Sequence, residues 1–141
     1  LRVDSYQRIT RYGLSAILRS CTKLQVLGFG GCSAVASCDP SVVPTGLREL
    51  VVANGAVGDT FIDTWVDALA KAKSPFQLEQ LDVSGCAGVS TEPLLRLLSK
   101  TKNMQRVRII GCPLIDSGRI EDVMPLWVDV DSAFEAVHVA Y

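Results

Sequence analysis

One short apolar pattern occurs four times in this chain, and this recurrence constrains the fold more than any other feature. Three copies, residues 24–32, 78–86 and 104–112, have apolar residues at their first, fourth and sixth positions and a cysteine at the ninth. A fourth copy, residues 47–55, keeps the apolar spacing and ends in glycine. The last two cysteines of the pattern occupy positions 86 and 112, a period typical of stacked supersecondary units. The sequence therefore predicts a repeat architecture.

Each copy predicts a short strand, a turn and, in most units, a helix. The last two apolar positions of a copy alternate with outward-facing ones, as they do in a strand. Helices are expected over residues 14–20, from Asp59 or Thr60 to about Lys73, over residues 92–100, and from Asp116 or Ser117 onward. The second unit is expected to hold no more than a helical turn, because prolines at positions 40 and 44 interrupt it. A final strand is expected over residues 134–139.

Strand-then-helix units that stack side by side predict a curved α/β solenoid. The parallel sheet would line the concave face and the wider helices would cover the convex face. The whole chain, residues 1–141, is expected to form one such domain of about five to six repeats. Residues 1–6 align with residues 27–32, so the chain begins inside a repeat. It is therefore interpreted as a fragment of a longer array or protein.

The repeated residues resemble the leucine-rich repeat family over essentially the whole chain. Residues 13–32 are similar to the cysteine-containing subclass found in F-box substrate adaptors, although no F-box segment is visible in the sequence. The resemblance implies a leucine-rich-repeat solenoid that binds a protein. Small proteins of about five such repeats also occur as subunits or assembly factors of mitochondrial complexes, and this chain is similar to them in size.

Charge and cysteine usage narrow the classes of partner and compartment. Fourteen basic and fifteen acidic residues give a net charge of -1, which removes the broad positive field that nucleic-acid binding needs. No apolar run approaches the length of a membrane span. The five cysteines form no CxxC pair and no zinc-like cluster, so no metal and no cofactor are predicted. Reduced thiols favour an intracellular, reducing compartment, the cytosol or alternatively the mitochondrion.

The cysteines of the pattern are interpreted as structural. Cys32, Cys86 and Cys112 each follow a strand, where a small buried thiol can donate to a loop carbonyl, and burial makes a thiol unreactive. Cys38 lies outside the pattern and is the cysteine expected to be exposed. The only histidine, His138, has no serine or cysteine placed to use it as a base, so no catalytic residue is predicted.

The residues between the apolar strand positions are expected to face outward and to bind a partner. Arg106 and Arg108 have the fork geometry that binds a carboxylate or phosphate. The alternative is that Arg108 neutralises Asp82, which occupies the equivalent position in the preceding unit. The predicted partner-binding residues are Val26, Glu49, Val51, Gln80, Asp82, Arg106, Arg108 and His138.

Three function classes remain open on these grounds. The first is a non-enzymatic protein–protein interaction module, a substrate-recognition or scaffold segment that binds its partner on the concave face or along a rim. The second is a structural subunit or assembly factor of a large complex, possibly mitochondrial, in which neighbouring subunits cover the ends of the solenoid. The third, more remote, is a thiol-dependent enzyme.

Overall fold

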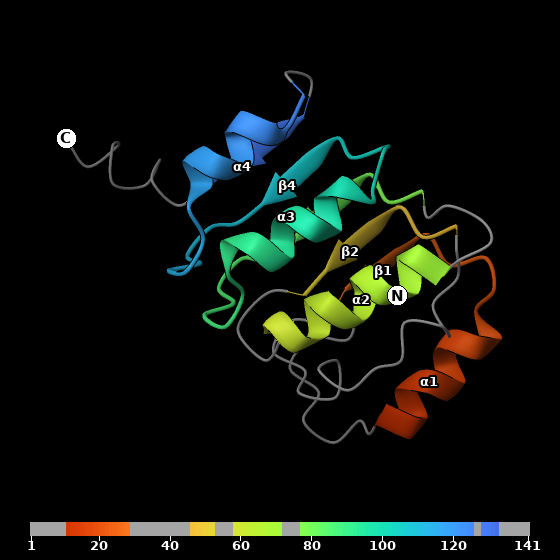
Figure 1. Ribbon diagram of the computed structural model, residues 1–141. Helices are drawn as coiled ribbons and strands as arrows, with labels where there is room; N and C mark the ends of the chain where they lie inside the picture. The colour runs from red at the N-terminus through yellow and green to blue at the C-terminus, as the bar shows by residue number, and fades with distance from the viewer. Residues whose placement is uncertain (1–10, 29–45, 53–57, 72–76, 126–127, 133–141) are drawn as a thin grey trace.

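The computed structural model describes residues 11–28, 46–52, 58–71, 77–125 and 128–132 (Figure 1). Within them the chain forms a five-stranded, entirely parallel sheet and four helices, which confirms an α/β fold. The strands lie in sequence order, β1-β2-β3-β4-β5. The elements are α1 (Arg11–Ser20), β1 (Val26–Gly28), β2 (Glu49–Val51), α2 (Asp59–Lys71), β3 (Gln80–Asp82), α3 (Thr91–Ser99), β4 (Arg106–Arg108), α4 (Ser117–Val123) and β5 (Asp129–Asp131).

All five strands share one register. The central residue of each strand pairs with the central residue of the next, which aligns Leu27, Leu50, Leu81, Val107 and Val130 in one row. The chain between successive members of this row is unequal in length and longest between β2 and β3, yet the register is kept throughout. The first four are buried and Val130 is partly buried. This row forms the sheet side of the hydrophobic core.

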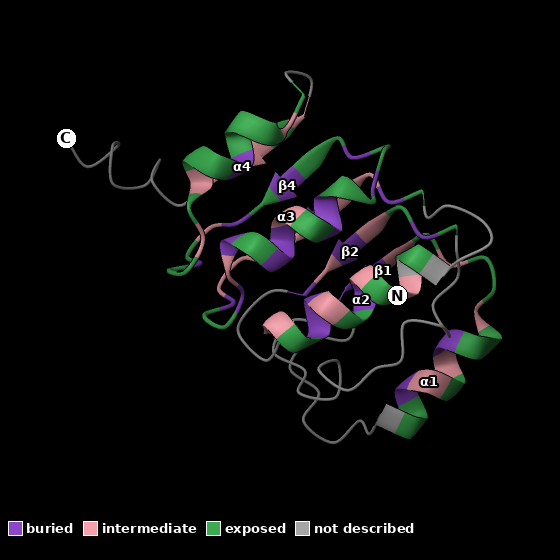
Figure 2. Ribbon diagram, in the orientation of Figure 1, coloured by how far each residue is buried: buried purple, intermediate pink, exposed green. Residues whose placement is uncertain are grey.

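The helices α2, α3 and α4 lie on the same face of the sheet (Figure 1). The middle helix of this layer is α3, which contacts both α2 and α4. Figure 2 shows buried residues on the sides of these helices that face the strands. Burial of these apolar stripes against the strand row is the main stabilising contribution to such a layered fold. The helical part of the core includes Leu14, Leu18, Phe61, Ile62, Trp65, Leu94, Leu97, Leu98 and Ile120.

The helix boundaries agree with the predicted ones to within a few residues. The second helix begins at Asp59, as predicted, and ends at Lys71, just before the predicted boundary. Its successor, α3, carries Pro93 in its first turn, where the missing N–H leaves no hydrogen bond unmade. Asp116 caps α4, because its Oδ1 accepts hydrogen bonds from the backbone N–H groups of Gly118 and Arg119 at 3.1 and 3.4 Å.

The turns after β3 and β4 have the same construction. Gly85 and Gly111 have φ values of 75° and 70°, a left-handed conformation that only glycine adopts at little cost. The cysteine that follows each glycine is buried. Cys86 donates its S–H to the carbonyl of Val52 at 2.9 Å, and Cys112 donates to the carbonyl of Val83 at 3.0 Å. The thiol in the turn after β3 therefore bonds to the residue that follows β2, and the thiol in the turn after β4 bonds to the residue that follows β3.

The repeated pattern does not predict the last described strand. The strand expected over residues 134–139 lies outside the described residues and stays a prediction, whereas β5, at Asp129–Asp131, is a strand that the pattern does not predict. The helix α4 ends at Val123, so the chain returns to the sheet sooner after β4 than it does after β2 or β3. Ser132 stands where the pattern has its third apolar residue, which hides the strand from a search based on apolar spacing.

Several other expectations also fall outside the described residues. These are the strand end at residues 1–6, the proline-interrupted return path of the second unit, and the positions of Cys32, Cys38 and His138. In the part of the chain that the structure describes, no helix is both long enough and apolar enough to cross a membrane.

Candidate functional site

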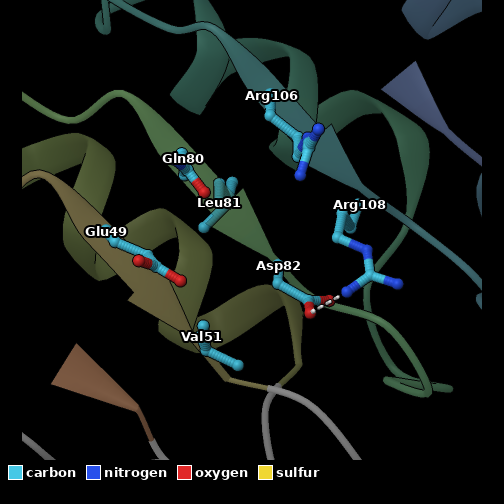
Figure 3. A pocket seen from close by; sticks show the side chains of 7 residues that line it. All are labelled: Glu49, Val51, Gln80, Leu81, Asp82, Arg106 and Arg108. Carbon is cyan, nitrogen blue, oxygen red and sulfur yellow. Dashed lines mark ion pairs between the residues drawn. The ribbon is translucent and has the colours of Figure 1, made fainter. Parts of the chain in front are cut away.

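The sheet face opposite the helices carries the outward side chains of the strands. Strand alternation sends the central residue of each strand into the core and its two neighbours to the other side. On strands β2, β3 and β4 these neighbours surround a hollow of about 170 Å³ (Figure 3). Leu81 borders the hollow as well, although its side chain belongs to the core. The outward lining residues are Glu49, Val51, Gln80, Asp82, Arg106 and Arg108.

Six of the eight residues predicted to bind a partner therefore lie around one hollow. Val26 is on the neighbouring strand β1, in register with Glu49, but it is not among the residues that line the hollow. His138 lies outside the described residues. The structure thus groups the predicted residues on β2 to β4.

Both arginines of the hollow contact aspartates on neighbouring strands. Arg106 Nε lies 3.3 Å from Oδ2 of Asp129 on β5. Arg108 lies between two carboxylates: its Nη1 is 3.7 Å from Asp82 Oδ2 on β3, and its Nε is 3.4 Å from Asp131 Oδ2 on β5. The predicted neutralisation of Asp82 by Arg108 is therefore present as an ion pair (Figure 3).

These ion pairs differ in how far they are shielded from water. The side chains of Arg106 and Asp129 are 51% and 56% exposed, so their pair contributes about 0 to 1 kcal/mol to stability. Asp82 is only 15% exposed, and its Oδ1 also accepts a hydrogen bond from the backbone N–H of Ser84 at 2.9 Å. Asp82 is therefore held in position both by Arg108 and by the backbone of Ser84.

Asp129 and Asp131 are the charged residues of this sheet face that sequence reasoning misses. They are in register with Arg106 and Arg108, and they bring two further carboxylates to the face. The available signal is the alternation of Val128 and Val130 with the two aspartates, which is the pattern of a half-buried strand. This alternation is not used in the sequence analysis, because the apolar pattern places the final strand at residues 134–139.

The outward charges of the described strands are predominantly acidic. Four carboxylates stand against two guanidinium groups, a net charge of -2 on this face compared with -1 for the whole chain. Each arginine already faces at least one carboxylate. An incoming anion would compete with these aspartates, so the arrangement favours a cation over the carboxylate or phosphate that the sequence pattern suggests. The carboxylates are Glu49, Asp82, Asp129 and Asp131.

A second hollow, of about 530 Å³, lies at the end of β4 beside the start of α4. It is lined in part by Ile109, Pro113, Ile115 and Cys112. Burial raises the pKa of the Cys112 thiol above its ordinary value, which favours the protonated form. A protonated thiol is a poor nucleophile, so Cys112 is not in the activated form that thiol catalysis uses.

The cysteines of the described part are all free thiols: Cys21, Cys86 and Cys112. Within the same residues, no group of three or more histidine, cysteine, aspartate or glutamate side chains is arranged to hold a metal ion.

Comparisons with known proteins identify no family. No model of a protein family matches the chain, and no curated protein matches it by sequence. The functional interpretation therefore depends on the geometry of the sheet face.

Proposed function

We propose that the chain is a leucine-rich-repeat solenoid that acts as a non-enzymatic protein-interaction module, with its partner bound on the sheet face. Three observations support the solenoid. The strands share one register, helices cover one face of the sheet, and equivalent glycine–cysteine turns follow β3 and β4. Units of this kind stack so that each contacts mainly its neighbours, which produces a long continuous face suited to binding another macromolecule.

The observation that carries the binding assignment is the hollow on β2, β3 and β4. Its outward residues are polar or charged, apart from Val51, and three adjacent strands hold them at fixed positions. Neighbouring strands are about 4.8 Å apart, so side chains of the three strands lie within reach of a single bound segment. Groups that are held in place before binding lose little conformational entropy on association, which favours affinity.

A bulky substitution in the hollow tests this assignment whatever the charge of the partner. Val51→Trp places an indole on the sheet face, where it fills the space that a partner would occupy. Ala70→Trp is the matched control, because Ala70 is exposed on α2, in the helix layer. Both substitutions leave the net charge of the chain unchanged, and both introduce a tryptophan side chain.

The measurement is the affinity of a purified partner that has first been captured with the wild-type chain and identified by mass spectrometry. Isothermal titration calorimetry is expected to show at least a tenfold weaker Kd for Val51→Trp, and a Kd within twofold of wild type for Ala70→Trp. Thermal unfolding confirms that both variants are folded. If Val51→Trp binds the partner as tightly as Ala70→Trp does, the sheet face is not the binding surface.

A further inference from the structure

We propose that the hollow on the sheet face receives an arginine side chain of the bound protein, between Glu49, Gln80 and Asp82. This inference rests on the proposed function, because it names the chemistry of the partner at that same face. It replaces the expectation that Arg106 and Arg108 bind an anionic group.

The side of the hollow formed by β2 and β3 is rich in hydrogen-bond acceptors. Glu49 and Asp82 contribute carboxylates, and Gln80, on the same strand as Asp82, contributes a side-chain carbonyl (Figure 3). Glu49 and Gln80 are in register, and Asp82 lies on the same face of β3, at the next outward position after Gln80. A guanidinium group carries five N–H donors in a planar fork, so it can donate to acceptors on both strands at once.

The opposite side of the hollow is formed by β4, whose positive charges are compensated from β5. Both arginine Nε groups of β4 face carboxylates of β5, at 3.3 and 3.4 Å. A cation in the hollow therefore meets two arginines whose fields are largely offset by Asp129 and Asp131. Arg108 also faces Asp82, so the guest would share one carboxylate with it.

The size and apolar content of the hollow also suit an arginine. A cavity of roughly 150 Å³ accommodates a benzene-sized guest, so about 170 Å³ is sufficient for a guanidinium head and part of its stem. Val51 provides an apolar contact for the methylene groups, in the way that long cationic side chains cover apolar surface. A planar guanidinium also fits two acceptors better than the compact ammonium of lysine does.

The test uses a blocked amino acid as the probe, so that it does not depend on a purified partner. The ¹⁵N-labelled chain is titrated with N-acetyl-arginine N-methylamide and, in parallel, with N-acetyl-glutamate N-methylamide. The arginine probe is expected to shift the backbone amides of β2 and β3 and the side-chain amide of Gln80 in a saturable manner. The glutamate probe is expected to give no saturable shift on β4.

Two variants test the proposal by the direction in which each changes the affinity for the arginine probe. Glu49→Gln is expected to weaken the arginine probe at least threefold, because a carboxylate acceptor becomes a neutral amide. Arg106→Gln is expected to leave its binding unchanged or to strengthen it, because a like charge is removed from the far wall. Glu49→Gln keeps the size and shape of the side chain, whereas Arg106→Gln shortens it, and the amide spectra show whether each variant is folded.

The proposal is overturned if the glutamate probe saturates at β4, or if Arg106→Gln weakens the arginine probe as much as Glu49→Gln does. These results are distinct from a failure of the proposed function. If the arginine probe does not bind while Val51→Trp still abolishes partner binding, the sheet face remains the interaction surface and only the arginine assignment is wrong.

Discussion

Truncation of Leu81 to alanine tests the shared core row of the sheet most directly. Leu81 is the central residue of β3, the middle strand, and its side chain is 1% exposed. It pairs in register with Leu50 on one side and Val107 on the other, and both are buried. The substitution should therefore open a cavity between strands that cannot easily move together.

The expected cost follows from two contributions. Loss of three buried carbons removes about 2.4 kcal/mol of transfer free energy, at about 0.8 kcal/mol per methylene group. The residual cavity adds to this, and measured leucine-to-alanine losses reach about 5 kcal/mol where the surroundings stay rigid. Because neighbours on both sides are fixed by strand pairing, we expect Leu81→Ala to lower the free energy of unfolding by about 3 to 4 kcal/mol.

Urea unfolding followed by circular dichroism measures this loss. Leu114→Ala is the matched control, because the Leu114 side chain is 56% exposed and the same atoms are removed there. We expect the control to change the free energy of unfolding by no more than about 0.5 kcal/mol. An unchanged dependence on denaturant concentration would show that the unfolded states are comparable.

One result would refute the reasoning. If Leu81→Ala and Leu114→Ala destabilise the chain equally, then Leu81 is not in a packed interior and the aligned row does not form the core. The solenoid proposal would then lose its structural basis.

Three further predictions concern the turns, the face and the buried thiol. Gly111→Ala should lower the stability of the fold by about 1 to 2 kcal/mol in thermal unfolding, because the φ of Gly111 is 70°. Gly46→Ala is the control: Gly46 has open space around it and no positive φ, so this substitution should leave the stability unchanged or raise it slightly. Arg108→Ala should cost at most about 1 kcal/mol at low salt and less at high salt, because the guanidinium is 46% exposed. Cys112 should react with iodoacetamide far more slowly than the half-buried Cys21 at neutral pH, and a faster rate would contradict its burial. Because burial raises the pKa of Cys112 in the folded state, its protonated thiol contributes stability at pH values below the ordinary thiol pKa. This contribution is lost as the pH rises through the raised pKa, and Cys112→Ala should abolish this pH dependence.

The sequence predicted the parallel sheet and the helix positions because both depend on local, periodic signals. The alternation that marks Leu50 as the inward residue of β2 and the aspartate that begins α2 can each be recognised from a few consecutive residues. Propensity, capping and apolar spacing act within a few residues, so they can be recognised without knowledge of the fold.

The electrostatics of the face could not be predicted in the same way. The pairing of Arg108 with Asp82 could be predicted, but the further partners of Arg106 and Arg108 depend on which residues of β5 stand opposite them, and this register depends on where the chain re-enters the sheet after α4. A re-entry point further along the chain would place different side chains beside the arginines. The aspartates of β5 therefore changed the expected ligand of the hollow from an anion to a cation.

The connections between the aligned central strand residues differ in length, and this shows which changes in chain length the fold can accept. Connections that differ in length join the strands without altering which residues pair, so they can absorb insertions or deletions on the helix side. A single residue added inside a strand has the opposite effect, because every later side chain of that strand is turned to the other face. Evolution or design can therefore change the length of the connections on the helix side, whereas the strands of the sheet face tolerate substitutions but not insertions.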